Sequence, residues 1–391
     1  MIKGDLLSGS EAAVLAAQLS SVRCTPMYPM IPQDDIVKKL SDLYSSQSDG
    51  KKTIEFFTLE SPVAALSASI ASEATGTRTF TVSTGPGLES MKELMYVASG
   101  MRLPLVMVNV SRSLSPTNIW NEHTDILSCR DTGWLIFITS NNQELLDTII
   151  QAYKIAENKK VLLPVLVNMD AFLQSHTREN VFVPSERSIS KFLPELNLPV
   201  GLNTSKPVSL NPPVKEEYME FKAQQHIAMK NAEKIIRNVD DIWNKKFHRK
   251  YGLIERFHME DAKYVIVVAG SAAEIAKTAV QELRAQNEKV GLLRPRVIRP
   301  WPKNDIREAL KNVKKVAVVD QDIMPGTGGI RLWSIDRPET CIEDYGKKYY
   351  CCKLIWMYDT TGNLSSNGIK GSIHSCSFES CCCCFWHIPL A

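Results

Sequence analysis

Short apolar segments alternate with helical patterns along the first 170 residues, and this alternation restricts the fold more than any other feature. Helical patterns occupy residues 62–73 and 88–98, between segments of strand character. The apolar segments lie at residues 54–58, 79–83, 105–110 and 161–167. Strands with so little polarity are typical of a parallel sheet that helices cover on both faces. The sequence therefore predicts an α/β fold.

A second, smaller α/β unit is expected to begin near Asp261. Its strands are predicted at residues 264–269, 290–293 and 316–319, and its helices at 272–286 and 304–310. Between the two units, residues 201–215 are rich in proline and read as an extended connector, and residues 216–250 read as a long polar helix. We therefore expect a first domain over residues 1–250 and a second over residues 260–330.

The segment 331–391 breaks with this pattern. Eight of the ten cysteines lie there, including a run of four at residues 381–384, whereas only Cys24 and Cys129 precede it. Their spacing fits neither a zinc finger nor a ferredoxin-type cluster. We interpret this Cys-rich segment as a non-native tail, such as a shifted reading frame would produce, and expect it to be poorly ordered or poorly packed. A genuine metal-binding appendage is the alternative.

Charge and hydropathy limit the partners and the compartment. A net charge of +3 without a block of Lys or Arg argues against a nucleic-acid partner. No segment reaches the roughly 18 apolar residues that span a bilayer. The first residues lack the pattern of a signal peptide, and two isolated cysteines in the body suit a reducing compartment. We therefore expect a cytoplasmic protein with no membrane partner.

Several motifs occur in an order that resembles the alpha chains of 2-oxoacid:ferredoxin oxidoreductases, and the pyruvate:ferredoxin oxidoreductase branch in particular. Each motif alone is weak, but their common order over about residues 5–330 is specific. They are YPMIPQ (28–33), RTFTVSTGPGL (78–88), GMRLP (100–104), NIW (118–120), RDTGW (130–134), SHT (175–177), YMEF (218–221), RPWP (299–302) and VDQ (319–321).

This resemblance implies a thiamine-diphosphate-enzyme-like parallel sheet domain followed by a transketolase-C-like domain. It implies the cleavage of pyruvate with coenzyme A to acetyl-CoA and carbon dioxide, with electrons passed to ferredoxin, or the reverse reaction of a pyruvate synthase. It also implies beta, gamma and delta partner subunits. The beta subunit would share the thiamine diphosphate, and partner chains would hold Mg²⁺ and iron–sulfur clusters.

The residues agree with that division of labour. A diphosphate site needs a glycine turn followed by oxygen ligands for Mg²⁺, and no Gly-Asp-Gly with downstream Asn ligands occurs here. A cluster needs closely spaced cysteines, which residues 1–330 lack. The histidines show no ligand spacing either, so we expect no metal in this chain.

Arg112 is the first candidate site residue. It follows an apolar strand and should lie at the carboxyl edge of the sheet, where open α/β folds bind ligands. The resemblance places this arginine on the substrate carboxylate, which a planar guanidinium recognises through two parallel hydrogen bonds. A surface salt bridge is the alternative.

The glycines Gly85 and Gly87 are the second candidate. They permit a tight turn where the backbone approaches a cofactor, and an ordinary strand–helix turn is the alternative. Nearby, Asp125 is expected to join an ion-pair network with the adjacent Arg-Asp pair of residues 130 and 131. The lone His123 is expected to be packed or exposed rather than a base.

Two departures from the family pattern bear on activity. Ile31 stands where the family has a threonine that hydrogen-bonds substrate. An ungapped count back from Arg78 places the family's thiamine-activating glutamate at Pro62, which supplies no acid, and Glu60 is the candidate substitute. The sequence therefore leaves two hypotheses: an active alpha subunit, or a catalytically silent paralogue that serves as a structural or interaction subunit.

Overall fold

The computed structural model describes residues 4–46, 54–205, 207–210, 215–322 and 348–353. It divides into two compact units, the first made of residues 1–254 and 295–302 and the second of residues 255–294 and 303–391. Residues 295–302, which the sequence-based prediction placed in the second domain, belong to the first unit.

The first unit is built on a parallel sheet with the strand order β12-β6-β7-β5-β4. Strands β4 (Phe80–Ser83), β5 (Val106–Ser111), β7 (Val165–Asp170) and β6 (Leu135–Ile138) are parallel and completely buried. The short β12 (Val297–Arg299) adds an antiparallel edge next to β6. The predicted α/β fold on a parallel sheet is confirmed.

A parallel bridge between Cys24 and Thr79 links β4 to a second pair of strands. That pair consists of β2 (Cys24–Met27) and β3 (Glu55–Thr58), which are also parallel. Strands β2 and β4 are therefore neighbours. The segments that follow them leave the sheet at the same edge, where parallel strands all end.

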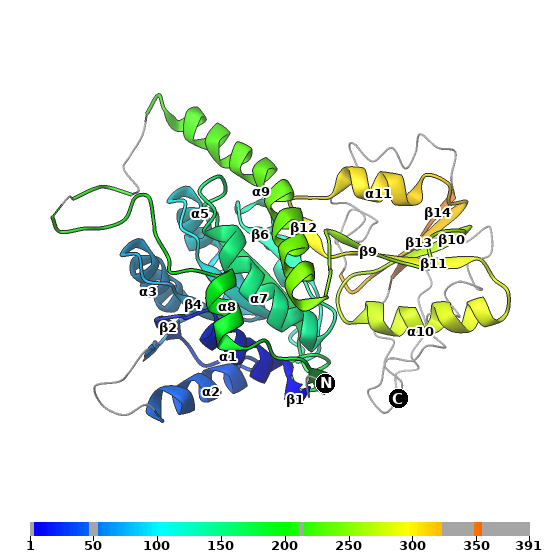
Figure 1. The fold of residues 1–391 in the computed structure, drawn as a ribbon, viewed down its shortest axis with the longest axis horizontal. Coiled ribbons are helices and arrows are strands. Elements are labelled where there is room, and N and C mark those ends of the chain that lie inside the picture. Colours follow the sequence, from blue (N-terminus) through cyan, green and yellow to red (C-terminus); the bar gives the residue numbers. More distant parts are fainter. Residues whose placement is uncertain (1–3, 47–53, 206, 211–214, 323–347, 354–391) are drawn as a thin grey trace. The chain divides into compact units, whose positions relative to one another are not determined.

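Helix α7 (Asn142–Ala156) contacts both α1 (Gly9–Leu19) and α9 (Tyr218–Phe247), and Figure 1 shows it between them. Helix α9 confirms the predicted long polar helix. It still buries one stripe, with Ala228, Ala232, Ile236, Val239 and Trp243 at spacings of three or four residues. That stripe explains how a helix of such polar composition packs on the first unit.

The remaining elements of the first unit are short. The strands β1 (Asp5–Ser8) and β8 (Arg178–Val181) pair antiparallel. The helices are α2 (Asp34–Ser45), α3 (Pro62–Ala74), α4 (Gly85–Ser90), α5 (Lys92–Gly100), α6 (Thr124–Ser128), the 3₁₀ turn η1 (Cys129–Asp131) and α8 (Glu186–Phe192). The glycine turn expected before residue 88 is itself the first turn of α4, because Pro at N1 or N2 favours a helix start.

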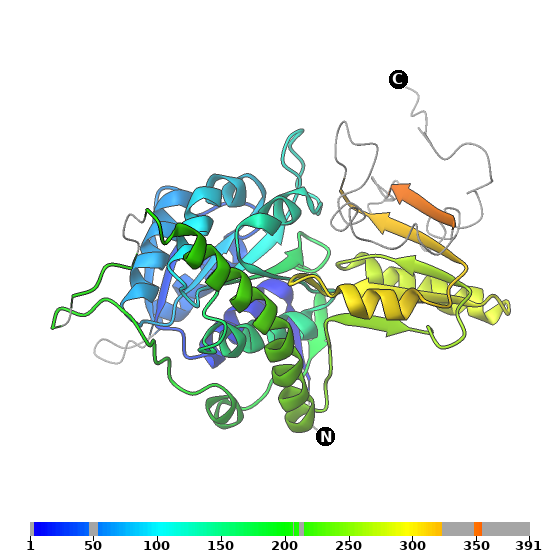
Figure 2. The ribbon, with the colours of Figure 1, turned by 90° about the horizontal axis from the view of Figure 1, so that it is seen from above.

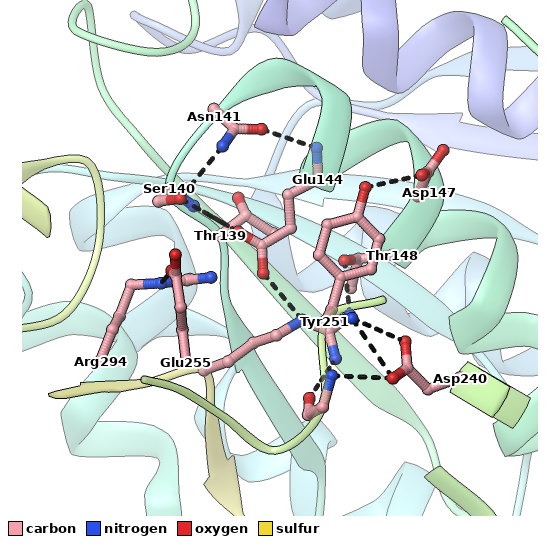
Figure 3. Close-up of polar contacts among 12 residues, drawn as sticks. Thr139, Ser140, Asn141, Glu144, Asp147, Thr148, Asp240, Tyr251, Glu255 and Arg294 are labelled. Carbon is pink, nitrogen blue, oxygen red and sulfur yellow. Dashed lines mark hydrogen bonds and ion pairs between the residues drawn. The ribbon is translucent and has the colours of Figure 1, made fainter. Parts of the chain in front are cut away.

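Two buried carboxylates of α7 bind the two segments through which the chain leaves the first unit, near residue 254, and returns to it, near residue 295. Asp147 accepts hydrogen bonds from Arg249 Nε (2.5 Å) and from Tyr251 Oη (2.7 Å). Glu144 accepts one from Arg296 Nε at 2.8 Å. Figure 3 shows both carboxylates on the same helix. Because an unpaired buried charge costs several kcal/mol, these contacts fix the two crossing segments firmly on α7.

The second unit has a five-stranded sheet of order β14-β13-β10-β11-β9. Helices α10 (Ala272–Ala285) and α11 (Lys303–Leu310) lie on opposite faces of it (Figure 1). Alanines of α10 pack with β10 and β11 in the core. The strands are β9 (Ile254–Phe257), β10 (Tyr264–Val267), β11 (Val290–Pro295), β13 (Lys315–Asp320) and β14 (Lys348–Lys353).

Strand β14 corrects the expectation for the Cys-rich segment. Residues 348–353 pair in parallel with all six residues of β13, and Figure 2 shows them side by side. Two tyrosines and two cysteines in succession give this stretch strand propensity, which the expectation of a poorly packed tail overlooked. The rest of residues 331–391 lies outside the described residues.

No helix within the described ranges is long and apolar enough to cross a membrane.

Candidate functional site

The predicted site residues gather at the carboxyl edge of the first sheet. The loop 28–33 follows β2, the glycine turn of α4 follows β4, and Arg112 follows β5 directly. Because these strands are parallel and adjacent, their following segments meet at one edge. Arg112 thus occupies the place that its sequence position predicts.

Arg112 is a buried cation. Its side chain is only 8% exposed, and its Nε donates a 3.0 Å hydrogen bond to the carbonyl oxygen of Ile31. The described residues give its guanidinium no acidic partner, so the alternative of a surface salt bridge finds no support. A buried charge without a counter-ion is costly unless an anion compensates it. The geometry therefore suits an anionic ligand at this edge.

Ile31 presents its apolar side chain outward. It is 56% exposed, while its carbonyl group is the one that Arg112 holds. The backbone at position 31 is therefore tied to the arginine, and the side chain adds no hydrogen-bond donor or acceptor to the site.

The two glycines lie against different partners. Gly85 has a φ of +39°, and a Cβ there would come within 3.0 Å of Arg112 Cγ. A Cβ on Gly87 would lie 1.9 Å from Tyr28 Oη, and that hydroxyl is hydrogen-bonded to Ser83 Oγ at 2.9 Å. Gly87 is therefore required by the packing of the Tyr28 ring, a role that sequence reasoning missed.

Asp125 is hydrogen-bonded rather than ion-paired. Its Oδ2 accepts hydrogen bonds from Gly85 N (3.1 Å) and Asn109 Nδ2 (3.0 Å), and its Oδ1 accepts one from Ser111 Oγ (2.5 Å). Complete burial raises the pKa of Asp125 above its usual value, and the bonds from Ser111 and Asn109 oppose that rise. The expected network with the Arg-Asp pair at 130 and 131 is thus wrong for Asp125.

The other polar residues near this edge are paired among themselves. Arg130 and Asp131 form a long contact of 3.7 Å, and Asp131 is 67% exposed at its side chain. His123 is buried, as one of the two expectations had it, and its Nε2 lies 2.7 Å from Asp170 Oδ1. The contact between His123 and Asp170 links the segment between β5 and η1 to the end of β7, whereas the contact between Arg130 and Asp131 stays within η1.

The start of α3 carries the position expected to hold the activating acid. Pro62 is the first residue of this helix, and Ser61 caps it by accepting a hydrogen bond from Ala64 N at 3.2 Å. Glu60 is exposed and lies outside the helix. The helix start is regular, so the proline fits the fold. Neither Pro62 nor the capping Ser61 carries a carboxyl group, so the expected acid at this helix start would have to come from Glu60.

Sequence signals for the missed residues were present but weak. Asn109 and Ser111 interrupt an otherwise apolar strand, and buried polar side chains need partners. Their shared partner, Asp125, lies in a separate short helix and could not be paired with them from spacing alone. Within the described ranges, no group of three or more His, Cys, Asp and Glu side chains is arranged to hold a metal ion.

A second buried polar cluster lies at the opposite edge of the same sheet. Glu73 accepts a 2.9 Å hydrogen bond from Thr79 N, and burial raises the pKa of Glu73 to about 8. Its second oxygen has no hydrogen-bond partner among the described residues. Next to it, Arg78 holds Glu157 with two hydrogen bonds of 2.6 and 2.8 Å. This cluster lies where β4 begins, away from the candidate site.

Comparisons with known proteins give two family matches. Residues 15–241 match the model described as pyruvate flavodoxin/ferredoxin oxidoreductase, thiamine diP-bdg. Residues 262–345 match pyruvate:ferredoxin oxidoreductase core domain II. The second match continues past Ile330, where the sequence-based boundary ended the domain.

Individual relatives agree with these matches. The chain is 41% identical to pyruvate synthase subunit PorA of Methanocaldococcus jannaschii over 86% of this chain and 88% of that protein. It is 36% identical to ketoisovalerate oxidoreductase subunit VorA of Pyrococcus horikoshii, over 83% and 82%. A 2-oxoglutarate:ferredoxin oxidoreductase structure from Magnetococcus marinus, solved with 2-oxoglutarate, coenzyme A and succinyl-CoA, shares the fold. It has a TM-score of 0.71 at 18% identity, and the match covers 95% of this chain and 65% of that one.

Proposed function

The chain belongs to the 2-oxoacid:ferredoxin oxidoreductase family as an alpha-type subunit, and from this we propose that it binds the oxoacid in a pyruvate synthase. The complex would cleave pyruvate with coenzyme A to acetyl-CoA and carbon dioxide and pass the electrons to ferredoxin, or run in reverse.

Arg112 is the observation that carries this proposal. Its guanidinium is buried at the ligand-binding edge of the sheet, without an acidic partner among the described residues. The carboxylate of a 2-oxoacid matches such a group in charge and in planar shape. Because the carbonyl of Ile31 already takes the Nε–H, the two terminal nitrogens are the ones that would hold the substrate.

Pyruvate is proposed over a branched oxoacid because the pyruvate synthase subunit is the more similar of the two relatives compared, at 41% against 36% identity. The exposed Ile31 adds an apolar surface beside Arg112 that a branched side chain could also contact. The test below therefore includes both substrates.

Thiamine diphosphate is the proposed cofactor, because the matched family model is described as thiamine-diphosphate-binding. When bound, it supplies the chemistry that stabilises the carbanion left by decarboxylation. Gly85 and Gly87 lie at the edge where it would approach this chain. Position 62 lacks the acid that would activate it, so the chain as written is expected to turn over slowly.

Partner chains follow from the same reading. The two relatives compared above are named as subunits. The candidate edge also exposes large apolar side chains, among them Ile31, Phe57, Val63 and Ile119. Such residues suit a subunit interface. We propose that a beta subunit covers this surface and supplies Mg²⁺ and the diphosphate site, and that gamma and delta subunits carry the iron–sulfur clusters.

The test is to purify the chain with its co-expressed partner subunits and to follow reduction of a low-potential dye. We expect slow reduction that requires both pyruvate and coenzyme A, with a smaller rate for 2-oxoisovalerate. A higher rate with 2-oxoisovalerate would reassign the substrate. No dependence on any 2-oxoacid, even after an acid is restored at position 62, would refute the oxidoreductase role and favour a structural subunit.

A further inference from the structure

Asp125 lies between the two segments that the proposed function assigns to different ligands. Its Oδ2 accepts hydrogen bonds from the backbone N–H of Gly85 at 3.1 Å and from that of Arg112 at 3.4 Å. The first belongs to the glycine turn at the cofactor side, and the second to the strand end that carries the substrate arginine. One carboxylate oxygen therefore joins the end of β4 to the end of β5.

Further donors hold the carboxylate in place. Asn109 Nδ2 donates to the same oxygen at 3.0 Å and also to Asn168 Oδ1 at 2.8 Å, which links the group to β7. The other oxygen receives Ser111 Oγ at 2.5 Å and the Ile126 N–H at 2.6 Å. A fully buried carboxylate with this many donors has a fixed orientation, because rotation would leave several donors unsatisfied.

We propose that Asp125 is a positioning residue that holds the Gly85 turn and the Arg112 backbone in register, so that the cofactor side and the substrate side of the site are ordered together. The proposal rests on the proposed function for the identity of the two ligands. The hydrogen bond from Arg112 Nε to the Ile31 carbonyl extends the same linkage to the loop after β2. Preorganisation of this kind lowers the ordering cost of binding.

The substitution Asp125→Asn tests the linkage with little change in volume. The asparagine side chain at position 125 would have two orientations. In one, its NH₂ group faces the N–H groups of Gly85 and Arg112, and in the other it faces the N–H of Ile126. In either orientation two hydrogen-bond donors face each other, and the negative charge of the carboxylate is gone. Loss of a charge-assisted hydrogen bond predicts roughly tenfold to hundredfold faster exchange of the amides it protected.

Asp147→Asn is the matched control. Asp147 is also a buried aspartate of the first unit with several donors, but these belong to Gln143 of α7, to Trp243 of α9 and to Arg249 and Tyr251 just after α9. It should destabilise the fold to a similar degree without touching the candidate edge. Any effect that Asp125→Asn has beyond this control is therefore local.

The readout is hydrogen–deuterium exchange of the full chain in its purified complex, first without ligand. We expect Asp125→Asn to accelerate exchange in both peptides, the one with Gly85 and the one with Arg112, and Asp147→Asn to accelerate it only around α7. Acceleration of one peptide without the other would overturn the proposed linkage. So would equal acceleration of both peptides in the control.

Ligands then separate this proposal from the proposed function. In the unaltered complex, thiamine diphosphate with Mg²⁺ should slow exchange at the Gly85 peptide, and pyruvate should slow it at the Arg112 peptide. In the Asp125→Asn variant, the concentration of each ligand that gives half-maximal protection from exchange should rise about tenfold or more. If neither ligand protects the unaltered complex, the ligand assignment fails, while the ligand-free result still decides the linkage. If both ligands protect the variant at unchanged concentrations, Asp125 has no positioning role.

Discussion

Restoring an acid at position 62 is the sharpest test of why this chain should be slow. The substitution Pro62→Glu, made with Ile31→Thr, places at both positions the side chains that the family resemblance leads us to expect there. The structure tolerates the first change. Position 62 is the first residue of α3, whose N–H has no helical partner in any case, and Ser61 caps the helix independently. A glutamate in the first turn also suits the helix dipole, by about 0.3–1 kcal/mol.

The expected gain comes mainly from position 62. A positioned acid or base is worth about 10²–10⁴ in rate. The threonine adds less, because one hydrogen bond to a buried substrate oxygen is worth on the order of 1–3 kcal/mol. Since Ile31 is already held through its carbonyl by Arg112, its side chain can change without moving the arginine.

The assay is pyruvate-dependent release of carbon dioxide from complexes assembled with the same beta subunit. Four versions are compared: the unaltered chain, each single substitution, and the pair. Ser67→Glu is the matched control, because it adds the same charge at an exposed position of the same helix. We expect Pro62→Glu to raise the rate at least a hundredfold, and Ser67→Glu to leave it unchanged.

One result refutes the reasoning directly. If the unaltered chain already turns over at a typical enzyme rate of about 1–10³ per second, position 62 does not limit it. Either Glu60 then supplies the acid, or the ungapped count to position 62 is wrong. Glu60→Gln separates these two explanations, because it abolishes turnover only in the first.

Three other predictions test separate parts of the structure. Arg112→Ala should raise the KM for pyruvate, because it removes a charged contact worth roughly 2–5 kcal/mol. Steady-state kinetics should show an unchanged KM for coenzyme A. If the variant and the unaltered chain have the same KM for pyruvate, Arg112 does not belong to the substrate site. Gly87→Ala should lower the free energy of unfolding by about 1–3 kcal/mol, because its Cβ overpacks against Tyr28, and adding Tyr28→Phe should restore part of that loss in a denaturant titration. Glu73→Gln should gain stability relative to the unaltered chain as the pH rises from 5 to 8, by on the order of 3–4 kcal/mol. The folded-state pKa of Glu73, about 8, lies above the ordinary 4.5, so the unaltered chain loses stability across that window. Denaturant titrations at both pH values measure the difference, and a constant difference would contradict the assigned pKa.

The elements that the sequence predicted well are those with a local cause. Buried parallel strands appear in the sequence as apolar runs, and the residues before and at a helix start indicate where the helix begins. The sequence therefore predicted the parallel strands of the first sheet and helix α3 to within a few residues. Strand β12 was missed because three residues carry no periodicity, and their partner β6 is far away in the chain. The position of Arg112 followed from strand direction alone. The hydrogen bonds of Asp125 did not, because they join three segments whose approach depends on the packed sheet.

The start of α3 shows why family membership and activity are separate questions for this chain. Proline at the first helical position satisfies every local requirement of the fold, because it fixes a helical φ and gives up only an N–H that has no helical partner. On the ungapped count, the same side chain stands where the family has the acid that activates the cofactor. We therefore expect this substitution to slow the chemistry without a cost in stability that would reveal it. Arg112 differs in this respect, because a buried guanidinium that has no acidic partner among the described residues costs stability until an anion binds. We therefore expect the folded chain to retain the binding of pyruvate where its turnover is slow.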